Sequence, residues 1–155
     1  MNTASLHGAY QLFRYNNILL ASVQGSCNLA LIEQFCEEFM QLGRSLVKAK
    51  PWAHIVMLEQ WELTVPEAEQ HITRLQQWCI EQGMSHVAQV FSFSPLKQYQ
   101  LERMLPDEQR YAKRVFKDID NATLWLSQQG FSCASKLSYI KNKPSMIQRH
   151  FDLVA

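Results

Sequence analysis

The most constraining feature of this sequence is the segment 52–83, in which a short apolar run is followed by an amphipathic helical pattern. The run 53–58, AHIVML, is nearly all apolar and has the length of a strand, which is typical of a strand buried on both faces of a sheet. After it, apolar residues recur at spacings of three and four, which predicts a helix with one buried stripe. The stripe comprises Val65, Ala68, Ile72, Leu75 and Cys79.

The segments on either side continue with further strands. Each is a run of strand length that is rich in β-branched or aromatic residues, and these runs are 10–15, 18–23, 86–93 and 112–116. Asn16 and Asn17 separate the first two runs. Because Asn tolerates a positive φ, the pair predicts a type I′ hairpin turn. Basic residues in the run 112–116 indicate an edge strand.

Helices are predicted between these strands, each with its own start signal. The first is capped by Ser26 or Asn28 and ends before Pro51. A short helix begins with Ser94 as its N-cap, and a last helix, 121–129, follows an aspartate cap. The order β-β-α-β-α-β-α-β-α predicts an α/β fold with a mixed, mostly parallel sheet of about five strands and flanking helices.

Composition and charge exclude several functional classes. The chain has 155 residues, of which 47% are hydrophobic and 19% are charged, a composition suited to one globular domain. The chain has 15 Lys and Arg residues and 14 Asp and Glu residues. Its net charge is therefore too small to favour binding to nucleic acid. The sequence shows no signal-peptide pattern, and no apolar run approaches the ~20 residues of a membrane span. We therefore expect a cytoplasmic protein without a transmembrane segment.

The patterning weakens after residue 131. We expect residues 1–131 to form the α/β domain and residues 132–155 to form a basic C-terminal extension, which has four Lys and Arg residues against Asp152 alone. Within the extension, 144–153 is interpreted either as a short helix that packs on the domain or as a disordered or partner-binding tail.

Cysteine and histidine spacing bears on redox chemistry and metals. The four cysteines lack C-x-x-C spacing, which indicates reduced thiols; they are Cys27, Cys36, Cys79 and Cys133. The five histidines show no metal-ligand spacing with cysteine or with each other; they are His7, His54, His71, His86 and His150. We expect no metal and no other cofactor.

The segment 59–64, EQWELT, joins the apolar strand to its helix, at the edge where an α/β sheet presents a site. Trp61 is interpreted either as a partner or ligand anchor or as a lid over the core. Thr64 begins the sequence T-V-P-E, which predicts a capping box with Glu67. The candidate binding residues are Gln60, Trp61, Glu62, Thr64 and, after the next buried strand, Ser94.

The element order and the segment 114–126, RVFKDIDNATLWL, resemble the STAS superfamily (sulfate transporter and anti-sigma-factor antagonist domains), and especially the bacterial STAS-like, or SpoIIAA-like, single-domain proteins. A last strand reading R-x-F, a D-x-x-x-A turn and a closing A-x-x-W-L helix recur in that group. The resemblance implies a non-catalytic domain that binds another protein, sometimes with a small ligand. In the antagonists, a Ser after an Asp at the start of the helix that follows the central strand is phosphorylated. The matching hydroxyl here is Thr64, although the Asp is absent.

Three functional hypotheses follow. The first is a non-enzymatic cytoplasmic regulatory or protein-interaction module with a protein partner, a class in which homodimers are common. The alternative is a small apolar-ligand (lipid-like) binding protein with a pocket under Trp61, which a closed core would exclude. The third is a hydrolase or transferase, which the absence of G-x-S-x-G, Walker A and G-x-G-x-x-G motifs disfavours.

Overall fold

The computed structural model describes residues 8–132 except 47, 49 and 106–108, together with the backbone of 149–153. The strands are β1 (Ala9–Tyr15), β2 (Ile18–Cys27), β3 (Trp52–Met57), β4 (Trp61–Thr64), β5 (Met84–Val90), β6 (Ala112–Phe116) and β7 (Arg149–Leu153). The helices are α1 (Leu29–Arg44), α2 (Glu69–Glu81), α3 (Pro95–Met104) and α4 (Ile119–Gln128), and a 3₁₀ turn, η3 (Pro66–Ala68), precedes α2.

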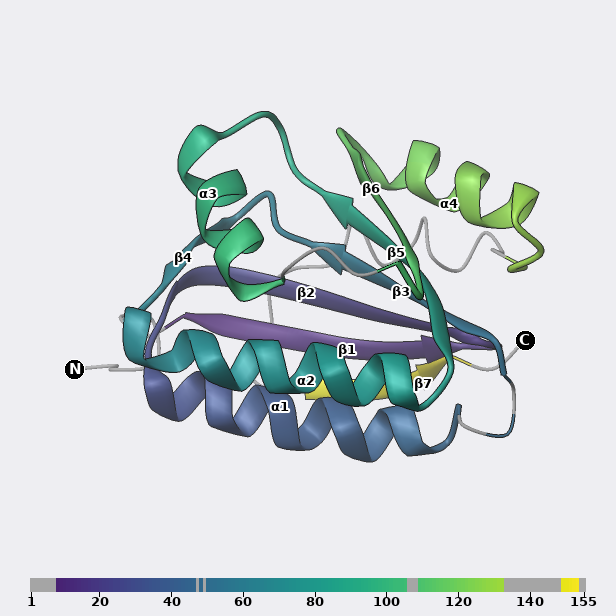
Figure 1. Cartoon of the computed structure of the whole chain (residues 1–155), viewed down its shortest axis with the longest axis horizontal. Helices are drawn as coiled ribbons and strands as arrows, with labels where there is room; N and C mark the ends of the chain where they lie inside the picture. Colours follow the sequence, from purple (N-terminus) through teal and green to yellow (C-terminus); the bar gives the residue numbers. More distant parts are fainter. Residues whose placement is uncertain (1–7, 47, 49, 106–108, 133–148, 154–155) are drawn as a thin grey trace.

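One mixed sheet forms the centre of the molecule (Figure 1). Its strand order is β6-β5-β3-β2-β1-β7, and β4 pairs with β2 outside this path. Only β1 and β2 pair antiparallel among the described strands. The predicted α/β class with a mostly parallel sheet is therefore confirmed, and the predicted edge position of β6 is confirmed with it.

The two faces of the sheet carry separate hydrophobic clusters. One cluster contains the buried hydrophobic residues of α1, α2 and α3, and the other contains those of α4 (Figure 1). The central strand β3 contributes Trp52 to the first cluster and Ala53 and Ile55 to the second. The strand is thus covered on both faces, as its apolar sequence predicts.

The hairpin between β1 and β2 differs from the prediction in its turn type. Tyr15 pairs with Ile18, which confirms a two-residue loop. The predicted type I′ turn is wrong, because Asn16 has a positive φ of 51° and Asn17 does not. Asn17 forms hydrogen bonds at the start of β3. Its carbonyl accepts from the Ala53 N–H at 2.9 Å, and its side-chain amide donates to the Pro51 carbonyl at 3.1 Å. These tertiary bonds set the conformation of the turn.

Three of the four α-helices begin at side-chain caps that their sequences predict. The side chains of Asn28, Ser94 and Asp118 accept from backbone N–H groups in the first turns of α1, α3 and α4. The capping box predicted for α2 is wrong. Thr64 lies in a strand, Val65 occupies the N-cap position of η3, and no side chain caps this start.

The end of the chain adds a strand that the sequence does not reveal. Arg149–Leu153 pairs in parallel with β1, so a helix over these residues is wrong, while 144–148 lie outside the described residues. In the part of the chain that the structure describes, no helix has the length and apolarity needed to cross a bilayer.

Gly8 should be more sensitive to substitution than Gly130, although both have positive φ, at 88° and 96°. A Cβ at Gly8 would lie 2.6 Å from the Gln24 carbonyl oxygen and 2.9 Å from that of Ser26, whereas a Cβ at Gly130 meets nothing within 4 Å. We expect Gly8→Ala to lower the free energy of unfolding by about 2–3 kcal/mol and Gly130→Ala by about 1 kcal/mol. Urea denaturation of both variants checks this. Equal losses would show that the contact with β2 contributes nothing.

Candidate functional site

The segment expected to be a loop, 59–64, contains strand β4. Gly25 pairs with Trp61 and Cys27 pairs with Thr64, on the part of β2 that extends beyond its pairing with β3. The Gly25 N–H donates to the Gln60 carbonyl at 2.8 Å. The backbone of residues 25–27 would otherwise lack partners along this edge, and buried backbone polar groups are almost always paired. This requirement explains why a four-residue strand forms here.

The pairing of β4 is irregular, and the irregularity has a backbone cost. The register shifts between Gly25 and Cys27, and Leu63 has a φ of 87°. A residue other than glycine in this region costs about 1–3 kcal/mol, and such residues cluster at binding and switch sites. The strained backbone therefore marks this end of the sheet as a candidate site.

Trp61 and Thr64, two of the predicted binding residues, lie in the core. Trp61 is almost fully buried, which confirms its interpretation as a core lid, and its indole N–H donates to the Thr64 hydroxyl at 3.1 Å. Phosphorylation of Thr64 stays a prediction. The hydroxyl is buried, so a kinase would reach it only after β4 moved away from the core.

Four of the predicted residues line one open groove of about 710 Å³, and Thr64 lies outside it. The four are Gln60, Trp61, Glu62 and Ser94. The other residues that line the groove are Gln24, Gly25, Glu59, Leu63, Leu96 and Lys97. The structure thus brings together the end of β2, the turn between β3 and β4, β4 itself and the start of α3.

Hydrogen bonds from two charged residues fix the groove wall. The ammonium group of Lys97 donates to the carbonyls of Leu58 and Glu59, each at 2.8 Å. The Glu59 carboxylate accepts from the backbone N–H and the hydroxyl of Ser92. The pKa of Glu59 lies below its usual value, mainly because its carboxylate accepts from the Ser92 N–H. The Ser92 hydroxyl and the positive charge of Lys97 lower it further. These contacts fasten α3 to the turn before β4.

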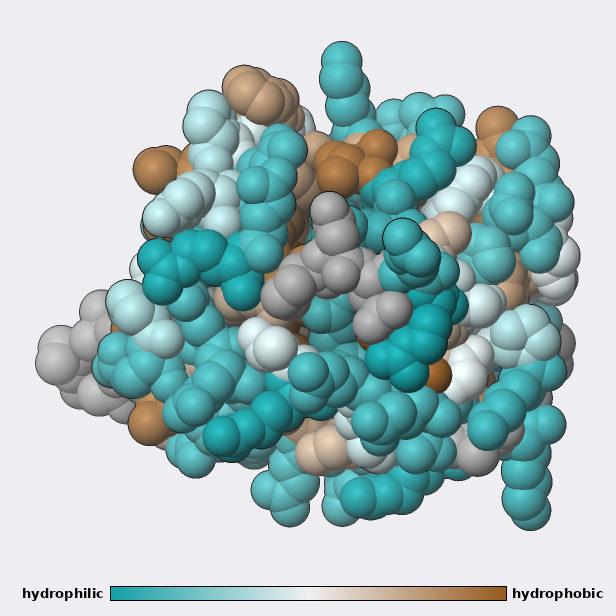
Figure 2. Space-filling model, viewed as in Figure 1, coloured by the Kyte–Doolittle hydropathy of each residue, from teal (hydrophilic) through white to brown (hydrophobic). Residues whose placement is uncertain are grey.

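A patch of large hydrophobic side chains adjoins this groove. Phe93, Leu96 and Tyr99 are 81%, 68% and 61% exposed, and we call them the α3 patch. Figure 2 shows brown side chains that project from the surface at the α3 end of the molecule. The sequence interpretation missed this patch, because Leu96 and Tyr99 have the three-residue spacing of a buried stripe. In the structure α3 buries Gln100, Leu101 and Met104 instead.

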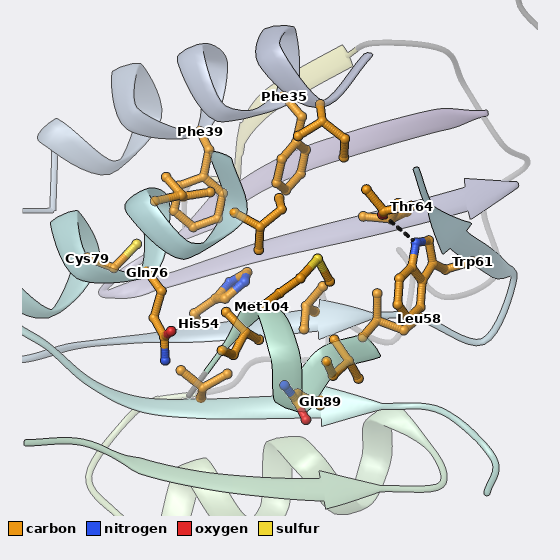
Figure 3. Close-up of a pocket in the computed structure, with 18 of the residues that line it drawn as sticks. Phe35, Phe39, His54, Leu58, Trp61, Thr64, Gln76, Cys79, Gln89 and Met104 are labelled. Carbon is orange, nitrogen blue, oxygen red and sulfur yellow. Dashed lines mark hydrogen bonds between the residues drawn. The ribbon is translucent and has the colours of Figure 1, made fainter. Parts of the chain in front are cut away.

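A partly open cavity of about 100 Å³, called the interior cavity below, lies between the sheet and the helices α1 and α2, and Trp61 is one of the residues that line both this cavity and the groove (Figure 3). Phe35 and Phe39 of α1 face it from the helix layer, and His54 and Gln89 face it from the sheet. The lining is almost entirely apolar.

His54 presents one ring nitrogen to this cavity. Its Nδ1 lies 2.9 Å from the Leu19 carbonyl, which only accepts, so Nδ1 carries the proton and Nε2 is a free acceptor. The ring also meets the Phe39 ring edge-on, at 5.0 Å between centroids. Burial lowers the pKa of His54 to about 4, so the imidazole is neutral at pH 7.

Gln89 presents a donor to the same cavity. Its side chain is 3% exposed, and its Nε2 has no hydrogen-bond partner within the described residues. A buried donor without a partner costs about 1–3 kcal/mol. An apolar cavity with a few converging polar groups is typical of a small-molecule site.

Metal-ligating groups do not form a cluster at either place within the described residues, although His54 and Cys79 both line the cavity. No group of three or more His, Cys, Asp or Glu side chains is arranged to hold a metal ion within the described residues. Cys27, Cys36 and Cys79 are free and buried, and Cys133 lies outside the described residues. Burial raises the pKa of Cys27 and of Cys36 to about 12, so these thiols are not reactive nucleophiles at neutral pH.

This architecture is a SpoIIAA-like, that is STAS-like, fold, as the element order of the sequence indicates. A crystal structure of an uncharacterised DUF3478-family protein from Shewanella loihica PV-4, described as SpoIIAA-like, is similar to this chain with a TM-score of 0.58. The similarity covers 81% of this chain and 98% of that chain, at 16% sequence identity. No protein-family model and no curated protein matches the sequence. The likeness therefore establishes the fold alone.

Proposed function

We propose that this protein is a non-enzymatic regulatory module of the STAS-like type, which acts in the cytoplasm by binding another protein at the groove and the α3 patch. The observation that carries the proposal is the strong exposure of Phe93, Leu96 and Tyr99 beside the groove. Aromatic and aliphatic side chains that project from one place anchor protein partners, because a few such residues supply most of the binding free energy.

The α3 patch is partly preorganised for binding. The guanidinium group of Arg103 lies 5.7 Å from the centroid of the Tyr99 ring, and it also pairs with Glu69 at 3.0 Å. A side chain that is already restrained loses less conformational entropy when a partner binds. We therefore expect Tyr99 to be an anchor residue.

The charged groups of the groove support a binding role over a catalytic one. The Lys97 ammonium group donates to two backbone carbonyls, and the Glu59 carboxylate accepts from Ser92, so both charged groups already have structural hydrogen bonds. The buried, free thiols suit a reducing compartment, which supports the cytoplasmic placement.

The experiment compares capture of partner proteins by the wild type and by a triple variant, Phe93→Ser, Leu96→Ser and Tyr99→Ser. The matched control is Leu124→Ser, because Leu124 is 56% exposed on α4, which covers the opposite face of the sheet. We expect one stoichiometric partner that the wild type and the control retain. With purified components, the triple variant should bind it at least ~10-fold more weakly.

Two outcomes would contradict this assignment. If the triple variant holds the partner as tightly as the wild type does, the interface lies elsewhere. If the wild type captures only copies of itself, which sedimentation would show, the α3 patch is a homodimer interface. Trp61 and Thr64 are unsuitable for this test, because substitution of buried residues perturbs folding as well as binding.

A small-ligand-binding protein is the second candidate function, and the interior cavity is the observation that favours it. The core is not closed beneath Trp61, as this alternative requires. Pockets that enclose drug-sized ligands usually measure about 300–1,000 Å³. At about 100 Å³ this cavity suits a smaller molecule than a whole lipid chain.

A further inference from the structure

The interior cavity offers one hydrogen-bond donor and one acceptor that no side chain in the described part of the chain uses. The donor is the amide Nε2 of Gln89, which is buried and unpartnered. The acceptor is Nε2 of His54, since Nδ1 holds the proton that the Leu19 carbonyl accepts. Both residues line the cavity (Figure 3).

The sheet places these two groups as near neighbours. β3 and β5 pair in parallel, with His54 opposite Val87 and Val56 opposite Gln89. His54 and Gln89 are therefore diagonal neighbours on one face of the sheet, where Cβ atoms lie roughly 7 Å apart. Both side chains line the same cavity from this face of the sheet (Figure 3).

We propose that the cavity binds a compact apolar molecule with a hydroxyl group, whose oxygen accepts from the Gln89 amide and whose hydrogen is donated to Nε2 of His54. A hydroxyl group is the smallest group that supplies both an acceptor and a donor from one atom. This inference rests on the second candidate function and names its ligand class.

The volume of the cavity limits the body of the ligand. A dry protein cavity of about 150 Å³ binds benzene. The present cavity is smaller, at about 100 Å³, but it is partly open, so about four non-hydrogen atoms of a ligand lie inside it and the rest of a ring lies at its mouth. A small cyclic alcohol or a phenol meets this limit, and a long acyl chain does not.

The test uses phenol and toluene, which differ by a hydroxyl in place of a methyl group. Each is titrated into the full ¹⁵N-labelled chain, and binding is followed by the chemical shifts of the Gln89 side-chain amide and of neighbouring backbone groups. We expect phenol to bind at least ~10-fold more tightly than toluene, because only phenol satisfies the two unpaired groups.

Two variants place the interaction. Gln89→Leu removes the donor and keeps a similar volume, so it should fold and reverse the preference in favour of toluene. Val87→Ile adds a methylene to the cavity wall and should weaken both ligands several-fold.

The possible outcomes separate this inference from the function on which it rests. Equal binding of phenol and toluene, in the wild type and in Gln89→Leu, would show a ligand site without hydroxyl recognition. The inference would then be wrong and the second candidate function would stand. Binding of neither probe would mean that the cavity holds water alone, and both would be wrong.

Discussion

Replacing Gln100 by leucine is expected to lower the free energy of unfolding by about 3 kcal/mol. The Gln100 side-chain amide bonds to the backbone of β4 as a neighbouring strand would. It accepts from the Thr64 N–H at 2.8 Å and donates to the Thr64 carbonyl at 2.5 Å. It also donates to Glu69 at 2.9 Å. Leucine would leave a buried N–H and a buried C=O without partners, at about 1–3 kcal/mol each, partly offset by added apolar burial.

Two further variants on α3 make this prediction specific. Gln98 bonds to Glu102 on the exposed side of the helix, so Gln98→Leu should change stability by no more than ~0.5 kcal/mol. Gln100→Glu keeps the acceptor, loses the donor and faces the carboxylate of Glu69, so it should destabilise at pH 7 and recover in part at pH 4–5. Urea denaturation measures all three. A small loss for Gln100→Leu would show that water replaces the amide.

The wild-type protein is expected to lose roughly 2 kcal/mol of stability between pH 7 and pH 5, and roughly 3 kcal/mol by pH 4, through His54 alone. Burial lowers the pKa of His54 from 6.5 to about 4 in the folded state. Between pH 6.5 and pH 4, His54 is therefore protonated in the unfolded chain but not in the folded chain, so acid favours unfolding. This contribution to stability is complete above pH 6.5 and is lost as the pH falls towards 4.

The measurement for His54 is a difference between two pH profiles. His54→Gln keeps a side-chain donor for the Leu19 carbonyl but does not titrate, so its free energy of unfolding should fall less steeply between pH 6.5 and pH 4. Acidic groups titrate in both proteins, and subtraction removes their effect. Parallel profiles would show that His54 is solvated in the folded protein and that its pKa is ordinary.

The elements that the sequence predicts correctly are those with local signals. The apolar run of β3, the stripe of α2 and the caps at Asn28, Ser94 and Asp118 are contained in a few neighbouring residues. β4 has no such signal, because it forms to satisfy the backbone of residues 25–27, which are distant in sequence. β7 likewise forms through pairing with β1, at the other end of the chain.

The site was predictable only in part, for a related reason. The position of the groove follows from the rule that α/β sheets present sites at strand ends. The exposure of the α3 patch does not follow from spacing, because its residues repeat as a buried stripe would. One signal for the cavity was present in the sequence: His54 and Gln89 are polar residues flanked on both sides by apolar residues within their strands. A polar side chain in a strand that is covered on both faces needs a hydrogen-bond partner. Here the space beside these two side chains is the cavity.

Trp61 belongs to both candidate sites, so an occupant that moves it at one site acts on the other. It is one of the residues that line the groove and one of those that line the interior cavity. A molecule in the cavity that shifts this ring changes the shape presented to a partner outside, and a partner that shifts it changes the space inside. Coupling free energies are reciprocal, so each occupant would alter the affinity of the other by the same factor. A small molecule that displaces Trp61 from the cavity side would in this way change the affinity for a protein partner at the groove.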